Sequence, residues 1–200
     1  MKNIICLGDS TTYGYMVNRK NIWTSILNDK SKEDNKDIIF INKGINGDMI
    51  SGMFARFDID CIKENPNSVI LMGGVNDIFT YKSLEKIEES FINIINKSNE
   101  NNIEIIAFTP IPFIKEAFTF FEANNLDELE DTLKKYVNFI NEYTKTNGIK
   151  SIDIYNMFIN NILKNHNYYD IYFDGVHLNE NGHSVFSLEL YKALSEIIIK

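Results

Sequence analysis

Residues 3–14 of this 200-residue chain read NIICLGDSTTYG, and this segment indicates both a fold and a candidate reactive residue. An apolar run at residues 4–7 leads directly into Gly8, Asp9 and Ser10, so we expect the serine where a buried strand ends and a turn begins. A lone serine at this position is more typical of a helix cap, because its side chain can accept a hydrogen bond from the next helix. Its role therefore depends on the rest of the chain.

Short apolar runs recur along the chain and alternate with segments of helical periodicity. Strands that alternate with helices favour parallel pairing with right-handed crossovers, and continuous apolar runs indicate a sheet covered on both faces. The pattern therefore predicts an α/β fold, a doubly wound sandwich with one five-stranded, mainly parallel sheet. The expected strands are residues 4–7, 38–41, 69–72, 103–108 and 151–154.

Two of the expected helices carry recognisable end signals. Apolar residues repeat at helical spacing from residue 84 to residue 95, and Ser83 is a plausible N-cap before them. A longer helical pattern covers residues 126–143, and Asn147 with Gly148 is expected to end that helix.

Composition places the chain among ordinary globular proteins and limits its partners. We expect residues 1–200 to form a single domain, since 44% of the residues are hydrophobic and 24% are charged. The net charge of −8 argues against nucleic acid and anionic membranes as partners. The apolar run near the start of the chain is too short for a signal peptide, and no run is long enough to insert stably in a membrane. We therefore expect a cytoplasmic protein, and its oligomeric state is unknown.

Histidine is the usual proton carrier near neutral pH, and the chain has three histidines. His166 is typical of a surface loop, and His183, at the start of the last expected helix, is typical of a capping or surface residue. His177 differs because Asp174 precedes it by three residues, which in a turn lets the carboxylate contact one ring nitrogen. The other ring nitrogen would then be available to activate the hydroxyl of Ser10.

Two glycine-rich segments follow the second and third expected strands. Residues 42–48 read NKGINGD, and residues 73–77 read GGVND. Glycines let backbone N–H groups approach a substrate closely, and the side-chain amide of Asn76 is a further donor. Turns of this kind are common between strands and helices, but here both follow strands whose carboxyl ends meet the same sheet edge as Ser10.

In these segments the sequence resembles the SGNH hydrolases, also called the GDSL lipase/esterase family. The resemblance implies a flavodoxin-like, three-layer α/β/α sandwich and a carboxylic ester or thioester hydrolase. One departure is Thr11, which stands where the family name has a leucine. The matching blocks are residues 8–10, the loop that ends at residue 47, residues 73–77 and the Asp174-x-x-His177 pair.

The resemblance also assigns roles to individual residues. It implies that Ser10 is the nucleophile, His177 the base and Asp174 the acid that orients the histidine. The implied oxyanion hole consists of the Ser10 N–H, the Gly47 N–H and the side chain of Asn76. Gly44 competes with Gly47 as the loop donor, and Gly47 is preferred because a polar residue and the next helix follow it. No cofactor and no metal are expected.

The expected partner is a small-molecule ester, but the sequence encodes its identity poorly. Residues 113–121, FIKEAFTFF, follow the fourth strand, and Phe113, Phe118 and Phe121 are candidates for a substrate wall. An equally weighted alternative is a helix that packs these rings into the core. Candidate substrates are short-chain acyl esters, lysophospholipid-like esters and O-acetylated carbohydrates. The alternative function is a flavodoxin-like module that binds phosphate or flavin mononucleotide at the first loop without hydrolysis.

Overall fold

A computed structural model describes residues 2–122 and 125–198. Five strands form one sheet in the order β2-β1-β3-β4-β5, and every neighbouring pair is parallel. This order is that of the flavodoxin-like folds, in which ligands bind at the carboxyl ends of the strands. The predicted fold class is therefore confirmed. The strands are β1 (Lys2–Gly8), β2 (Ile38–Gly44), β3 (Ser68–Met72), β4 (Glu104–Phe108) and β5 (Lys150–Ile152).

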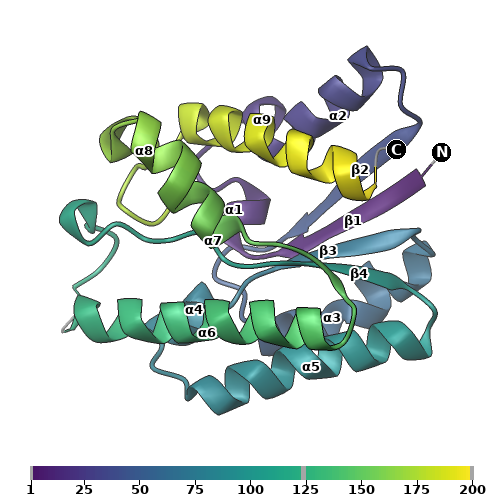
Figure 1. The fold of residues 1–200 in the computed structure, drawn as a ribbon, viewed down its shortest axis with the longest axis horizontal. Helices are drawn as coiled ribbons and strands as arrows, with labels where there is room; N and C mark the ends of the chain where they lie inside the picture. Colours follow the sequence, from purple (N-terminus) through teal and green to yellow (C-terminus); the bar gives the residue numbers. More distant parts are fainter. Residues whose placement is uncertain (1, 123–124, 199–200) are drawn as a thin grey trace.

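Helices cover both faces of the sheet and make three layers (Figure 1). The α-helices are α1 (Ser10–Tyr13), α2 (Trp23–Glu33), α3 (Ile50–Asp60), α4 (Val75–Phe79), α5 (Leu84–Glu100), α6 (Leu126–Thr146), α7 (Ile154–Met157), α8 (Leu163–Asn165) and α9 (Glu180–Ile197). Short 3₁₀ turns are η1 (Arg19–Asn21), η2 (Ile62–Glu64), η3 (Lys115–Ala117) and η5 (Tyr168–Asp170), and η4 (Phe158–Ile162) is a π-helical turn.

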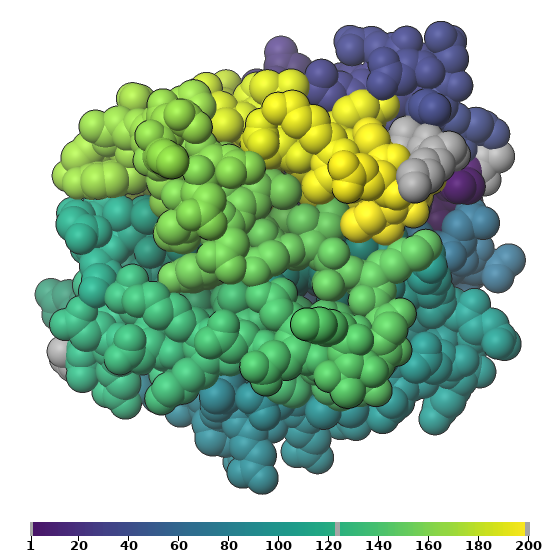
Figure 2. All heavy atoms as spheres, viewed as in Figure 1, coloured from purple at the N-terminus to yellow at the C-terminus, as the bar shows by residue number. Residues whose placement is uncertain are grey.

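The alternation of side chains along the strands divides the core in two. In β1, Ile5 and Leu7 pack with α3, α5 and α6, whereas Ile4 and Cys6 pack on the other face with α2, α9 and η4. Both sets are fully buried, which explains why the strands read as continuous apolar runs. In the same view with all atoms drawn, the green and yellow C-terminal segments close over the sheet (Figure 2).

The ends of several elements differ from their prediction. Ile154, expected in the last strand, is instead the first residue of α7. Ser83 occupies the N-cap of α5 as predicted, but its side chain makes no capping hydrogen bond. The end of α6 agrees with the prediction, since Asn147 is its C-cap and Gly148 follows with φ of +64°.

One side chain on α2 reaches the backbone of the edge strand β2. The amide of Asn28 donates to the Phe40 carbonyl at 2.9 Å, and its oxygen accepts from the Phe40 N–H at 2.7 Å. The helix layer is thereby joined to the sheet margin by a pair of hydrogen bonds like those of a neighbouring strand.

Within the part of the chain that the structure describes, no helix combines the length and the apolar character needed to cross a bilayer. The single-domain organisation and the cytoplasmic location stay predictions.

Candidate active site

Ser10 is the first residue of α1, directly beyond the carboxyl end of β1. The helix cap is Asp9, whose Oδ1 accepts a hydrogen bond from the Thr11 N–H at 2.9 Å. The capping role considered for the serine thus belongs to its neighbour. Because Asp9 satisfies the helix end, the Ser10 hydroxyl remains available for another partner.

Asp174 and His177 lie in a tight loop whose ends are paired. Tyr172 and Leu178 form an antiparallel bridge, and the Phe173 N–H donates to the His177 carbonyl at 2.8 Å. Inside the loop, Asp174 Oδ1 accepts from the His177 N–H at 2.8 Å. These bonds fix the aspartate relative to the histidine backbone.

The loop needs a glycine at position 175. Gly175 has φ of +80°, a region that favours glycine, and a Cβ there would approach the carbonyl oxygen of Ile114 to 2.7 Å. The Ile114 N–H donates to the Gly175 carbonyl at 2.7 Å, and the Thr119 N–H donates to the Asp174 carbonyl at 3.0 Å. These two backbone hydrogen bonds join residues 172–178, the histidine loop, to the segment that follows β4.

Ser10, His177 and Asp174 form a continuous chain of contacts. His177 Nε2 lies 3.1 Å from Ser10 Oγ, and His177 Nδ1 lies 2.8 Å from Asp174 Oδ2. Ser10 and His177 are both buried, at 8% and 4% exposure. Since an ionised carboxylate only accepts hydrogen bonds, the ring proton lies on Nδ1 and leaves Nε2 to accept from the serine hydroxyl.

Hydrogen bonding keeps Asp174 in its ionised form. Burial acts to raise the pKa of this carboxyl, but the bonds from the His177 ring and from the N–H groups of His177 and Val176 outweigh it, so the pKa is lowered. An ionised carboxylate at this distance is able to stabilise a protonated imidazole.

The two residues expected as further oxyanion donors lie on neighbouring segments, Gly47 in the loop after β2 and Asn76 at the start of α4. Gly47 has φ of +73°, and Asn76, in the first turn of α4, donates from Nδ2 to the Asp48 carbonyl at 2.9 Å. The competing Gly44 is the last residue of β2, and its N–H already donates to Asn42 Oδ1 at 3.0 Å. This engagement favours Gly47 over Gly44 as the loop donor.

A small cavity lies directly beside the serine. Its walls come from the segments that follow β1 and β4, from the start of α4 and from the histidine loop. Two of the expected oxyanion residues, Ser10 and Asn76, share it, and Gly47 is not among its lining residues. The cavity is lined by Asp9, Ser10, Thr11, Val75, Asn76, Ile111, Phe113 and Val176.

The aromatic segment after β4 divides into parts with different surroundings. Phe113, Phe118 and Phe121 all pack edge-to-face on Phe79, and of the three only Phe113 lines the cavity. The segment contains only the short turn η3, so the helix of the alternative is wrong, but Phe113 does belong to the buried core and Phe118 packs against it. The backbone of this segment is irregular because the N–H groups of Ile114 and Thr119 donate to the carbonyls of residues 175 and 174.

Two rings that were not among the predicted site residues contact the imidazole. The centroid of Tyr15 lies 4.5 Å from that of His177, and the centroid of Phe120 lies 4.7 Å away in an edge-to-face arrangement. Phe120 belongs to the aromatic run, which was its only signal in the sequence. Tyr15 carries no comparable signal, because only the turn of the chain at Gly14 brings it back to the site.

Asp9 is a second buried carboxyl at the site, with 4% exposure. Burial raises its pKa to about 6, against the opposing effects of the Thr11 hydrogen bond and the charge of His177. Its direct contact is with the backbone of α1, through the bond from the Thr11 N–H.

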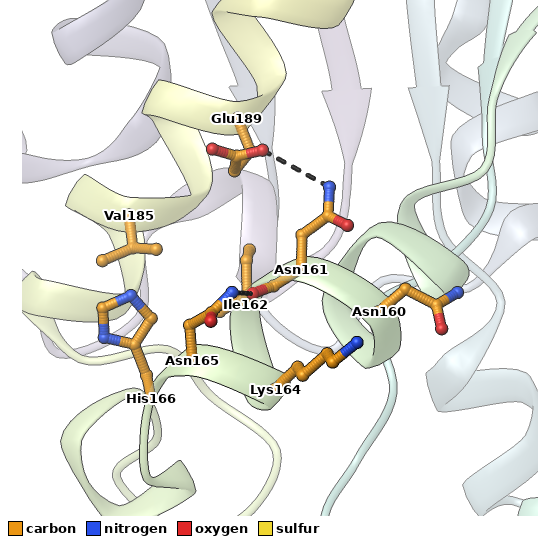
Figure 3. Close-up of a pocket in the computed structure, with 8 residues that line it drawn as sticks. All are labelled: Asn160, Asn161, Ile162, Lys164, Asn165, His166, Val185 and Glu189. Atoms are coloured by element: carbon orange, nitrogen blue, oxygen red, sulfur yellow. Dashed lines mark hydrogen bonds between the residues drawn. The ribbon is translucent and has the colours of Figure 1, made fainter.

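The other two histidines lie away from the serine. His166 is exposed and lines a separate polar pocket, where Figure 3 shows its ring beside Val185. None of the three residues of the chain of contacts lines that pocket. His183 is 1% exposed, so the expected surface position is wrong. Its Nδ1 accepts from the Trp23 N–H at 3.3 Å, which makes it a cap for α2, and burial lowers its pKa to about 4.

Across residues 2–122 and 125–198, no three histidine, cysteine, aspartate or glutamate side chains gather in a way that could hold a metal ion.

The sheet order and the flanking helices define the fold as the α/β sandwich of the SGNH type, and the site lies at the carboxyl edge of its sheet. The profile of the GDSL-like lipase/acylhydrolase family matches residues 6–185, and this chain therefore belongs to that family. The predicted family and the predicted enzyme class, a carboxylic ester hydrolase, are thus confirmed.

Individual relatives agree with this assignment. The chain is 23% identical to an acetylxylan esterase of Geobacillus stearothermophilus over 151 residues, which cover 74% of this chain and 68% of the relative. It is 29% identical to an arylesterase of Vibrio mimicus over 103 residues, only 52% of that protein. The crystal structure of the acetyl xylan esterase AlAXEase superposes with a TM-score of 0.81 at 24% identity, covering 96% of this chain and 99% of that one.

Proposed function

We propose that this enzyme hydrolyses small acyl esters through a Ser10-His177-Asp174 triad and an acyl-enzyme intermediate. The observation that carries the proposal is the unbroken contact from Ser10 Oγ through both ring nitrogens of His177 to Asp174. Family membership supports this reading over a flavodoxin-like binding module, which would use only the first loop.

In the first half-reaction, Ser10 Oγ attacks the ester carbonyl carbon while His177 Nε2 takes the hydroxyl proton. The carbonyl electrons move to oxygen, and the resulting negative charge is met by N–H groups of Ser10, Gly47 and Asn76. The tetrahedral intermediate then reforms the carbonyl and expels the alcohol oxygen, which receives the proton from His177. The products of this step are the free alcohol and an ester between the acyl group and Ser10.

In the second half-reaction, water takes the place of the alcohol. His177 Nε2 removes a proton from water as its oxygen attacks the acyl carbon. Collapse of the second tetrahedral intermediate breaks the bond to Ser10 Oγ, which recovers its proton from the imidazolium. The carboxylic acid leaves and the enzyme returns to its starting state.

The cavity beside Ser10 supports a small acyl group. Val75, Ile111 and Phe113 give it apolar walls, and its volume is about 10 Å³. This is roughly the room of one water molecule or one methyl group. Among the candidate substrates, acetyl esters such as O-acetylated carbohydrates therefore fit better than esters of long acyl chains. The names of the two acetyl xylan esterase relatives agree with this choice.

The test is hydrolysis of nitrophenyl acetate, butyrate and octanoate by the wild type and by Ser10→Ala. We expect the acetate to give the highest kcat/KM, and Ser10→Ala to lose several orders of magnitude in kcat. Ser90→Ala, which removes an exposed hydroxyl on α5, is the matched control. Equal turnover by wild type and Ser10→Ala, or the absence of labelling at Ser10 by a fluorophosphonate, contradicts the proposal.

The acyl preference is tested by enlarging the cavity. Phe113→Ala removes one wall, and we expect the ratio of butyrate to acetate hydrolysis to rise. Phe139→Ala, which truncates a partly buried ring that packs against the core from α6, controls for loss of stability alone. An unchanged chain-length profile in Phe113→Ala would remove Phe113 from the acyl site.

A further inference from the structure

We infer that Arg56 is a positioning residue that holds the donors of the oxyanion hole in their relative places. The inference deepens the proposed function and rests on it. Arg56 lies in α3 and belongs to none of the segments that carry Ser10, Gly47 or Asn76. Its guanidinium nevertheless bonds to the segments of Ser10 and Gly47 through two of its nitrogens, and to its own helix through the third.

The side chain of Arg56 is largely buried, with 14% exposure. Its Nε donates to Asp48 Oδ2 at 2.8 Å, and its Nη2 donates to the Gly8 carbonyl at 3.1 Å. Its Nη1 donates to Asp60 Oδ2 at 2.6 Å. The third bond lies within α3 and anchors the guanidinium to its own helix.

The first two partners are neighbours of the expected oxyanion donors. Gly8 lies two residues before Ser10, and Asp48 directly follows Gly47. The backbone carbonyl of Asp48 also accepts the bond from Asn76 Nδ2 at 2.9 Å. The arginine therefore adds a second link between the end of β1 and the Gly47 loop, beside the bond from the Ile45 N–H to the Gly8 carbonyl, and the same loop residue, Asp48, orients the Asn76 amide.

Arg56 adds side-chain bonds to a Gly47 loop that has few other contacts with the body of the protein. The Cβ position of Gly47 faces open space, and the backbone bond that joins the loop to β1 is the one from the Ile45 N–H to the Gly8 carbonyl at 3.0 Å. Asp48, which directly follows Gly47, is held by the hydrogen bond that its carboxylate accepts from Arg56 Nε. Donors to an oxyanion act only when they are aimed within a few tenths of an ångström, so the anchor bears directly on turnover.

Arginine is suited to this role in a way that lysine is not. The guanidinium is planar and presents its N–H groups in a rigid fork, whereas an ammonium is a point charge on a flexible stem. Three acceptors in different directions, on Asp48, Asp60 and Gly8, match such a fork. Arg56→Lys keeps the charge but is expected to satisfy these acceptors only in part.

The experiment measures kcat and KM on nitrophenyl acetate for Arg56→Lys and Arg56→Gln, with active sites counted by fluorophosphonate labelling. We expect Arg56→Gln to lower kcat about tenfold to a hundredfold, less than the roughly 10²–10³-fold expected when one donor is deleted. KM should change less than about threefold, because the donors act on the transition state. Arg56→Lys should fall between the wild type and Arg56→Gln.

A double-variant cycle separates positioning from a general loss of structure. If Arg56 acts through the donors, then Arg56→Gln should cost clearly less in an Asn76→Ala background than in the wild type. The matched control is Asp58→Asn, which removes the surface ion pair between α3 and Lys97 at 2.8 Å and should leave kcat unchanged. Asp48→Asn keeps the carbonyl that holds Asn76 and provides a second, milder variant should Arg56→Gln fold poorly.

The outcomes are distinguishable. Wild-type kcat per active site in Arg56→Gln and Asp48→Asn, with only the melting temperature lowered, overturns the inference and makes Arg56 a structural ion-pair residue. The inference is also overturned if the fold-loss of kcat in the double variant equals the product of the fold-losses in the two single variants. Retained activity in Ser10→Ala removes the proposed function itself, and that result involves no variant of Arg56.

Discussion

His177 and His183 are six residues apart, and both are buried, yet their surroundings give them different chemistry. The loop that carries His177 presents one ring nitrogen to a carboxylate and the other to a hydroxyl. At the start of α9, His183 meets a backbone N–H, and burial holds it neutral. Burial alone therefore does not mark a reactive histidine; an acidic partner on one side and a nucleophile on the other do.

The difference originates in the local backbone. His177 sits in a loop whose carboxylate is three residues away and is fixed by backbone bonds, so the acid and the base are supplied by the same short segment. His183 is held on a regular helix, where its ring points into the packing between α9 and α2. The loop therefore places His177 between a carboxylate and a hydroxyl, whereas the helix places His183 in a packed interior.

The largest effect expected from this comparison is on turnover. His177→Asn removes the proton carrier, and kcat on nitrophenyl acetate should fall about 10⁴-fold or more. His183→Asn keeps an acceptor near the position of Nδ1, and kcat should stay within about twofold of wild type. Steady-state kinetics with counted active sites measure both. Comparable losses in the two variants would mean that the two histidines are not functionally distinct.

The next effect concerns acid stability and belongs to His183. Its pKa is about 4 in the folded protein and near 6.5 when unfolded, so between these values the unfolded chain binds a proton that the native protein does not. Stability from this group is therefore complete above pH 6.5 and falls as the pH is lowered towards 4. At 1.36 kcal/mol per pKa unit, the loss amounts to roughly 3 kcal/mol.

Urea unfolding of wild type and His183→Asn at several pH values measures this dependence. The free energy of unfolding of the wild type relative to the variant should decrease from pH 6.5 to pH 4. Asp9 titrates with the opposite sign, because its raised pKa makes the native protein bind the extra proton below about pH 6. This contribution is present in both proteins and cancels in the difference. A difference that is constant with pH would contradict a neutral, buried His183.

The smallest effect sharpens the description of the His177 side of the comparison. Phe120→Leu keeps an apolar side chain but removes the ring that meets the imidazole edge-to-face. A contact of this kind contributes about 0.5–1.5 kcal/mol, so kcat/KM should fall about two- to tenfold. Phe173→Leu, an exposed ring in the same loop as His177, is the control and should have less effect. Equal values for the two variants would show that the Phe120 ring does not position His177.

Much of the fold was accessible from the sequence because its strands are short apolar runs and its helices are amphipathic. The same patterns fixed the order of elements but not their ends, as Ile154 illustrates, because an apolar residue suits both a strand and the helix that follows. The grouping of Ser10, Asp174 and His177 was predicted from the family blocks. The distances support it, and the catalytic roles stay predictions.

Contacts between residues that lie far apart in the sequence could not be predicted from these patterns. Arg56 has no pattern around it that indicates a bond to the Gly8 carbonyl, 48 positions earlier in the chain. Tyr15 and Phe120 meet His177 only because two loops converge on it, and the burial of His183 depends on the packing of α9 against α2. Such contacts depend on side-chain direction between distant segments, which periodicity does not contain.

The pair of bonds between Asn28 and Phe40 has a consequence for association with other molecules. A strand at the margin of a sheet exposes backbone groups that can template an added strand and begin aggregation. At the middle of β2 one donor and one acceptor of that template are already occupied by a side chain of the same protein. At the opposite margin, β5 spans only three residues. Both edges of the sheet therefore disfavour pairing with a strand of another molecule. The Asn28 side chain occupies backbone groups of β2, and β5 is too short to offer many such groups.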